Sequence, residues 1–154
     1  MTPDGPNTPS RSELAAFETA TRDLVGLALR SVDESGLSIP QFRLLLALSE
    51  SGPMSSTACA QTLGVAGSSV TRLATRLQAA GLLVRGDDPA NRSVVTLSPS
   101  DAGRQLIEQV IARRRAELSG VLERMDPAVR DRCAAGLEAL HQLLGEHSPS
   151  RLPV

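Results

Sequence analysis

The chain has 154 residues, with 16 basic and 17 acidic side chains and a formal net charge of −1 at pH 7. This length suits a single domain with a sizeable core. Trp and Tyr are absent and Phe occurs twice, so the chain lacks the aromatic platforms on which unpaired bases stack. The composition therefore argues against a protein that binds RNA or single-stranded DNA.

Cysteine usage and hydropathy are typical of a protein in the reducing cytoplasm. Cys59 and Cys133 are isolated thiols, too few for a disulfide framework or a zinc ribbon. Residues 1–13 lack the apolar stretch of a secretory signal, and no apolar run approaches membrane-spanning length. We expect a soluble cytoplasmic protein with no membrane partner. Because no nucleophile–base pair, phosphate loop or metal-ligand cluster is recognisable, we expect no enzyme activity, no cofactor and no bound metal.

The first half of the chain predicts a tail and two helices. Residues 1–10 hold three Pro with Gly, Asn, Thr and Ser, a composition typical of a flexible tail. Apolar spacing predicts a helix over about residues 12–32, with an apolar arc wide enough to contact more than one neighbour. Pro40 lies in the first turn of the next helix, which Gly52 and Pro53 end. The apolar residues of this second helix are predicted to form the core centre: Phe42, Leu45, Leu46 and Leu48.

Two short helices with a tight turn between them follow. The first is predicted over residues 56–63 and ends at Gly64, and the second over about residues 68–80 and ends at Gly81. A short glycine-containing turn between compact helices is typical of a helix-turn-helix, whose second helix lies in the major groove. Val65 is expected to plug the corner of this turn. The first helix has three candidate capping residues, Ser55, Ser56 and Thr57.

The second of these helices has one apolar face and one polar face. Spacings of three and four place Val70, Leu73, Ala74 and Leu77 on one buried stripe. The opposite face carries hydroxyl and guanidinium groups, which can contact base edges and phosphates. No acidic residue occurs over residues 51–86, so a polyanion meets an uninterrupted positive field there. The candidate DNA-binding residues in and before this helix are Ser55, Ser56, Ser68, Ser69, Thr71, Arg72 and Arg76.

A hairpin is predicted directly after this helix. Residues 82–84 and 94–97 predict short strands, and residues 86–91 have turn chemistry. A hairpin in this place is the wing of a winged helix-turn-helix. The predicted fold class is therefore mainly α with a small β-wing.

Two long helices complete the chain. Ser100 caps a helix over about residues 101–125, which extends well beyond the winged-helix body at about 1.5 Å per residue. Asp126 and Pro127 begin a last helix that runs to about residue 146. The apolar positions of both helices need a partner surface. Together with the first helix, they predict a symmetric homodimer that places two reading helices about 34 Å apart, for a palindromic double-stranded DNA site.

Several motifs resemble those of the MarR family of winged-helix transcription regulators, in the right order and at the right separations. They are LSIPQF, SSVTRLATRLQAAGLLVR, DPANR and SDAG. The resemblance covers roughly residues 12–146 and implies a dimer built from the terminal helices, with a small-molecule effector. It assigns Arg92, at the wing tip, to the minor groove or its phosphates. Three residues depart from the family pattern and imply a weaker grip by the wing: Asn91, Ser93 and Pro99.

These observations divide the chain into five parts. They are a flexible tail (1–10), an N-terminal dimerisation helix (11–36), a winged helix-turn-helix DNA-binding region (37–99), C-terminal dimerisation helices (100–147) and a C-terminal tail (148–154). The sequence favours a sequence-specific DNA-binding transcription regulator, a repressor that a small-molecule effector releases from DNA. It does not locate the effector pocket.

Two alternatives stay open at this point. The first is a winged-helix module that binds protein, with weak or no DNA binding. The second is a regulator that senses oxidants through a thiol. Packing is favoured over sensing for both cysteines, because the family resemblance places Cys59 at an apolar core position and Cys133 lies on the apolar stripe of the last helix.

Overall fold

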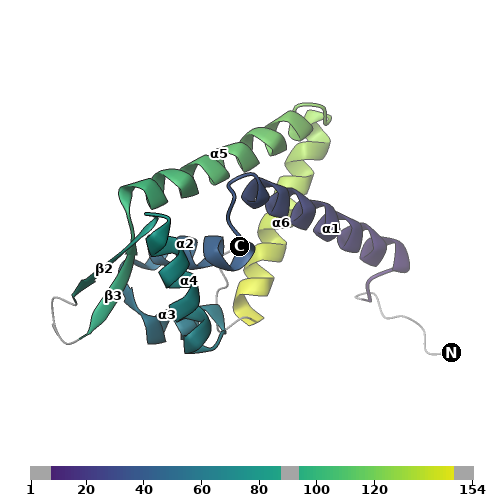
Figure 1. Ribbon diagram of the computed structural model, residues 1–154. Coiled ribbons are helices and arrows are strands. Elements are labelled where there is room, and N and C mark those ends of the chain that lie inside the picture. Colours follow the sequence, from purple (N-terminus) through teal and green to yellow (C-terminus); the bar gives the residue numbers. More distant parts are fainter. Residues whose placement is uncertain (1–7, 88–93, 148–154) are drawn as a thin grey trace.

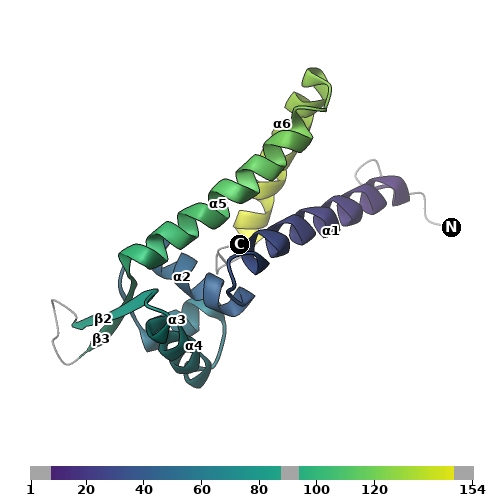
Figure 2. The same ribbon diagram turned by 45° about the horizontal axis from the view of Figure 1, so that its top comes forward.

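The computed structural model describes residues 8–87 and 94–147. Two long helices, α1 and α5, project from a lobe that contains the short helices and the sheet, and a third long helix, α6, begins at the far end of α5 (Figures 1 and 2). The predicted fold class, mainly α with a small β-wing, is confirmed. The elements in chain order are α1 (Arg11–Asp33), α2 (Ile39–Ser51), β1 (Met54–Ser55), α3 (Ser56–Leu63), α4 (Gly67–Ala79), β2 (Leu83–Asp87), β3 (Val95–Pro99), α5 (Asp101–Leu122) and α6 (Pro127–His147).

The sheet is antiparallel and has the strand order β1-β3-β2. The sequence predicted the wing strands β2 and β3 but not β1, because two residues are too few to show an alternating pattern. Gly86 and Asp87 were predicted to belong to the turn, and this was wrong. They pair with Thr96 and Val95 and extend β2. Backbone pairing with β3 holds these exposed residues in the strand, although their side chains carry no strand signal.

Helices α3 and α4 end in the same backbone motif. Gly64 follows α3 with a φ of 66°, and Gly81 follows α4 with a φ of 71°. Glycine adopts this left-handed conformation without the steric cost of a Cβ. In each case the N–H of the next residue donates to the carbonyl five residues earlier, as in the Schellman motif: Val65 to Ala60 at 3.0 Å and Leu82 to Leu77 at 2.9 Å.

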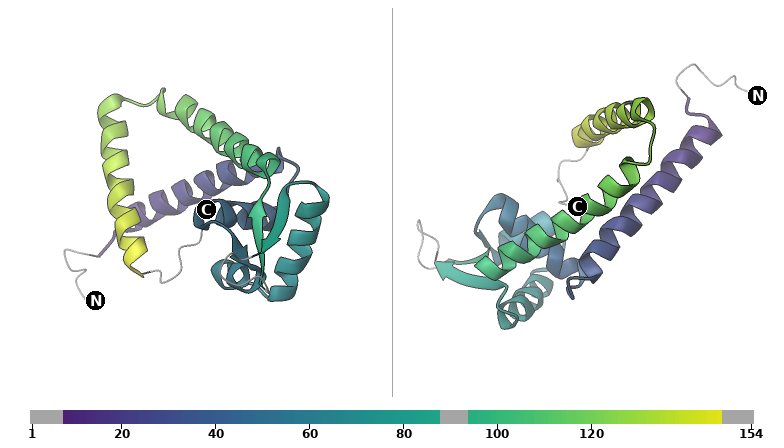
Figure 3. Two further views of the ribbon diagram at one scale, coloured as in Figure 1. Left: turned by 90° about the vertical axis from the view of Figure 1, so that its left-hand side faces the viewer. Right: turned by 90° about the horizontal axis from the view of Figure 1, so that it is seen from above.

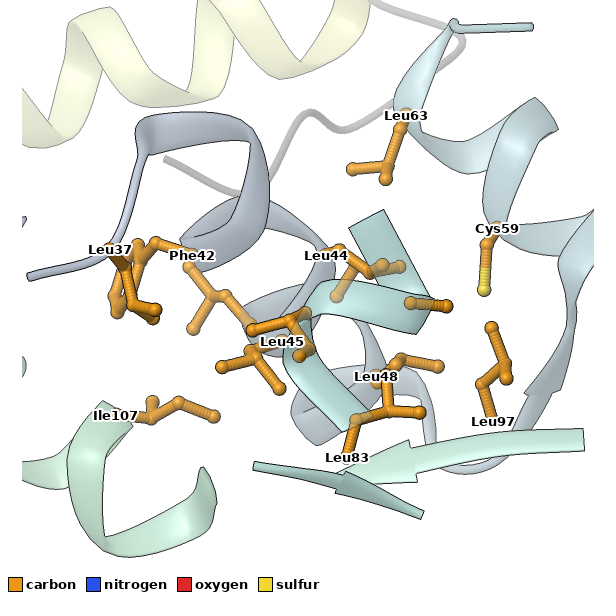
Figure 4. Close-up of a cluster of buried hydrophobic side chains, with 14 of the residues drawn as sticks. Leu37, Phe42, Leu44, Leu45, Leu48, Cys59, Leu63, Leu83, Leu97 and Ile107 are labelled. Carbon is orange, nitrogen blue, oxygen red and sulfur yellow. The ribbon is translucent and has the colours of Figure 1, made fainter. Parts of the chain in front are cut away.

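Helix α2 passes through the centre of the lobe and is buried on several sides. All four predicted core residues of this helix are buried, and Leu44 and Ala47 are buried beside them. Figure 4 shows α2 leucines facing Cys59 of α3, Leu83 and Leu97 of the sheet, and Ile107 of α5. A helix surrounded in this way holds the lobe together, so the positions of α3 and α4 follow from their packing against it.

Polar contacts join the C-terminal end of α1 to α5, where the two helices lie side by side (Figure 3, right). Arg30 pairs with Glu117 at 2.7 Å, and Arg113 pairs with Glu34 at 2.9 Å. Between these pairs, the Arg114 Nε donates to the Oγ of buried Ser31 at 3.4 Å. Exposed ion pairs contribute little free energy. Their main effect here is to select one register of α1 on α5.

Gly103, in the first turn of α5, packs against the backbone that follows α4. A Cβ at this position would collide with the Leu82 carbonyl oxygen, whereas one at Gly120 of the same helix meets nothing within 4 Å. We expect Gly103→Ala to lower the free energy of unfolding by about 2 kcal/mol, because displaced backbone costs more than the roughly 1 kcal/mol that Ala gains over Gly in a helix. Gly120→Ala, the control, should gain up to about 1 kcal/mol. Urea denaturation at one protein concentration measures both. A Gly103→Ala variant as stable as the Gly120→Ala variant would contradict the close approach.

Candidate nucleic-acid interface

Helix α4 turns its apolar stripe inward and its polar face to solvent, as predicted. Val70, Ala74 and Leu77 are fully buried in the core, and Leu73 is half-buried. Ser69 lies at the edge of the polar face and is half-buried. The exposed residues of this face are Ser68, Thr71, Arg72, Thr75 and Arg76.

The two arginines of α4 carry unopposed charge. Among the residues that the structure describes, neither Arg72 nor Arg76 forms an ion pair, whereas Arg30, Arg104 and Arg113 each do. The acid-free stretch of residues 51–86 explains this difference. A guanidinium without a protein partner keeps all its donors available for phosphate or for guanine O6 and N7.

The threonine hydroxyls of α4 are already used as donors within the helix. Thr71 Oγ1 donates to the Gly67 carbonyl at 3.1 Å, and Thr75 Oγ1 donates to the Thr71 carbonyl at 2.9 Å. In this arrangement each hydroxyl oxygen offers an acceptor to the outside. An acceptor matches the amino groups of adenine and cytosine in the major groove. Thr75 was not among the predicted DNA-binding residues, although its spacing of four from Thr71 was a usable signal.

Two of the predicted residues lie at the start of α3. Ser55 is the N-cap, and its Oγ accepts from the Ala58 N–H at 3.2 Å. Ser56 is the first residue of the helix, and both serines are half-buried. The capping role predicted for Ser55 is confirmed. A helix N-terminus also offers free N–H groups and the positive end of the helix dipole to a phosphate.

A depression of about 320 Å³ lies between the start of α2 and the exposed face of α4. Val65 lies in its wall with 39% of its surface exposed, so the prediction that it plugs the corner of the turn was wrong. The backbone motif after Gly64 holds Val65 on the outside of the turn. The residues that line the depression are Pro40, Val65, Ser69, Arg72, Leu73 and Arg76.

The wing is tied to α4 by a contact that the sequence did not predict. Arg85 of β2 donates from Nε to the Gln78 Oε1 of α4 at 3.0 Å. The two residues lie on different elements with a helix end between them, so no periodic pattern could have paired them. The contact orients the exposed Arg85 beside the last turn of α4. Arg92, predicted at the wing tip, lies outside the described residues, as do Asn91 and Ser93.

The two thiols lie in different environments. Cys59 is fully buried, and burial raises the pKa of its thiol. This confirms the predicted packing role, since a neutral buried thiol is a poor nucleophile. Cys133, which was also expected to pack, is exposed in the single chain. No residue of α6 whose burial the structure describes belongs to the lobe core, so this side chain packs only if another surface covers α6.

We expect Cys59 to resist iodoacetamide in the native protein at pH 8 and to react fully in denaturant. The reason is that both burial and the raised pKa suppress the thiolate, which is the reacting species. Peptide mass spectrometry after native and denatured labelling reads each cysteine separately. Rapid native labelling of Cys59 would instead favour the oxidant-sensing alternative, and Cys59→Ser with Cys133→Ser would then test that role in DNA release.

Within the described residues, no helix combines the length and apolarity that crossing a membrane requires. No group of three or more His, Cys, Asp or Glu side chains in the same residues is placed to hold a metal ion.

A helix-turn-helix with an exposed basic second helix and an adjacent hairpin defines a winged-helix protein of the DNA-binding class. Comparisons with known proteins agree with this class. Residues 35–92 match the sequence description of the MarR family. The structure of RV1404 from Mycobacterium tuberculosis is 32% identical and superposes with a TM-score of 0.82, covering 91% of this chain and 97% of that one. A MarR family protein from Bacillus stearothermophilus is 25% identical, with a TM-score of 0.75 over 90% of this chain and 99% of that one.

The chain belongs to the MarR family. It is also 31% identical over 94 residues to the HTH-type transcriptional repressor MdtR of Bacillus subtilis (strain 168), a match that covers 61% of each protein.

Proposed function

We propose that this protein is a homodimeric transcription repressor of the cytoplasm that binds a palindromic double-stranded DNA operator through α4. The observation that carries the proposal is the exposed face of α4, where Arg72 and Arg76 have no ion-pair partner among the described residues. A positive face without nearby carboxylates attracts the DNA backbone, and arginine pairs with guanine by two hydrogen bonds. Helix α4 is the recognition helix in this proposal.

Each candidate residue has a role in this proposal. Arg72 and Arg76 contact base edges or phosphates, and Ser68, Ser69 and Thr71 contact base edges and backbone. Ser55 and Ser56, at the N-terminus of α3, contact phosphate. Arg92 reaches the minor groove or its phosphates, an assignment that rests on the family resemblance alone.

The apolar surfaces of α1 and α6 support the homodimer. Phe17 is 55% exposed, Leu137 52% and Leu144 61% in the single chain. Neighbouring apolar side chains at this level of exposure mark an interaction surface. We assign residues 11–36 and 100–147 to the dimer and residues 37–99 to DNA binding. A two-fold axis through the terminal helices presents two copies of α4 to successive major grooves on one side of the duplex.

Repression and release by a small molecule complete the proposal. MdtR, the relative in Bacillus subtilis, is a transcriptional repressor. An effector releases DNA only if it binds more tightly to a dimer whose recognition helices no longer match the groove spacing.

The test is binding to the gene's own upstream DNA, measured by fluorescence anisotropy across a salt series. We expect the logarithm of the association constant to fall linearly with the logarithm of the salt concentration. Specific binding should exceed binding to scrambled DNA by at least about 10³ at one salt concentration. Genomic footprinting of the tagged protein then identifies the operator. No DNA binding at low salt would reject the proposal and favour the protein-interaction module.

A further inference from the structure

Two segments far apart in the chain meet where the wing joins the body. Gly81 follows the C-terminal end of α4. Strand β3 leads directly into α5 (Figure 1), with Ser100 between them. Ser100 Oγ donates to the Gly81 carbonyl at 2.6 Å, and the Ser100 N–H donates to the Leu82 carbonyl at 3.0 Å. The segment that directly follows α4 is therefore joined by two hydrogen bonds to Ser100, the N-cap of α5.

The Ser100 hydroxyl forms two hydrogen bonds in this junction, one as donor and one as acceptor. Besides donating to Gly81, its oxygen accepts from the Gly103 N–H at 3.0 Å and so caps α5. Gly103 adds a third contact, because its missing Cβ lets the first turn of α5 lie against the Leu82 backbone. Capping alone needs only an acceptor, which Asp, Asn and Thr also provide. The donated hydrogen bond to Gly81 is thus a separate feature.

These contacts differ in kind from those that hold the rest of α4. The stripe of Val70, Ala74 and Leu77 packs through apolar contacts, which are non-directional. Packed helices can shift by about 1–2 Å between alternative arrangements. Directional hydrogen bonds at the end of α4 oppose such a shift relative to α5.

Resting on the proposed function, we propose that Ser100 is a positioning residue that couples the recognition helix to α5. Through this coupling, a change in the angle between the two subunits changes the position of the exposed face of α4. Helix α5 contacts α1 through the ion pairs at Arg30 and Arg113 and continues to α6. The junction then makes α4, the base of the wing and the start of α5 one rigid unit. A change of angle between the subunits would move both recognition helices through it.

Ser100→Asp keeps the acceptor role of the Ser100 side chain and removes its donor role. Aspartate accepts from the Gly103 N–H and keeps the cap, but a carboxylate has no hydrogen to donate to Gly81. Ala102→Asp is the matched control, because it adds the same charge on an exposed residue of the same turn and leaves the junction intact. Ser100→Thr keeps both the acceptor and the donor. We expect operator affinity to fall about tenfold in Ser100→Asp and to stay within about twofold in the other two.

A second measurement is independent of DNA. Spin labels at exposed Thr75 of α4 and Gln109 of α5, introduced as cysteines in a Cys133→Ser background, report the distance between the two helices. We expect a broader distance distribution in Ser100→Asp than in wild type, Ala102→Asp or Ser100→Thr, at unchanged helix content. Should Ser100→Asp fail to fold, Ser100→Gly takes its place, since Gly is tolerated as an N-cap and also lacks the donor.

The outcomes separate this inference from the proposed function. Wild-type protein that binds no operator rejects the function, and the spin-label distances then decide the inference alone. Equal distances in wild type and Ser100→Asp overturn the inference, and so does an affinity loss in Ala102→Asp as large as that in Ser100→Asp. Loss of affinity with a broadened distribution in Ser100→Asp, and rescue of both by Ser100→Thr, supports it.

Discussion

Replacing Arg72 and Arg76 together by Ala should lower operator affinity by about 100-fold, and each single replacement by about tenfold. Both side chains are exposed, and neither has an ion-pair partner among the described residues. Their removal therefore takes away a DNA contact without breaking a contact that supports the fold. Anisotropy titration with the operator and with scrambled DNA measures both the loss and its specificity.

The pattern of the loss distinguishes base contacts from phosphate contacts. An arginine that reads guanine relaxes specificity at one base pair when it is removed, whereas one that binds phosphate reduces the salt slope by about 1 for all sequences. Arg115→Ala is the matched control, because it removes the same charge from an exposed position on α5. Equal losses in Arg115→Ala and Arg76→Ala would mean that overall charge, and not the face of α4, carries the binding.

Leu137→Glu combined with Leu144→Glu should convert the dimer into monomers and abolish specific operator binding. The two leucines lie seven residues apart on α6 and are among its most exposed apolar side chains. In a dimer each Glu would be buried without a partner, which costs several kcal/mol per charge. Sedimentation equilibrium should show the 16.2 kDa chain mass for the variant and twice that mass for wild type.

The control for this prediction is Ala135→Glu combined with Gln142→Glu. These residues also lie seven apart and are exposed, but they are offset by about 200° around the helix from the two leucines. This variant should remain dimeric and bind the operator. A leucine double variant that stays dimeric, with helix content unchanged by circular dichroism, would place the subunit interface elsewhere.

Local signals in the sequence were enough to predict most of the helices and the orientation of α4. The N-cap at Ser55, the stop at Gly64 and the stripe from Val70 to Leu77 each depend on residues within one or two helical turns. Such interactions are encoded in neighbouring residues, so capping and periodicity rules recover them. The polar face of α4 followed directly, because fixing the buried stripe also fixes which side chains face outward. The assignment of that face to DNA stays a prediction.

Only the tertiary structure decided how the elements are joined and which surfaces stay exposed. The contact of Arg85 with Gln78 and that of Ser100 with Gly81 join residues 7 and 19 positions apart across element boundaries. Strand β1 exists because β3 offers it backbone partners, and Val65 lies in the wall of a depression because Pro40 and the exposed face of α4 complete it. Cys133 was expected to pack and is exposed, since among the side chains that the structure describes none from α6 joins the core of its own chain. Each outcome depends on three-dimensional neighbours, and a period of 3.6 or 2 residues carries no information about neighbours that are distant in sequence.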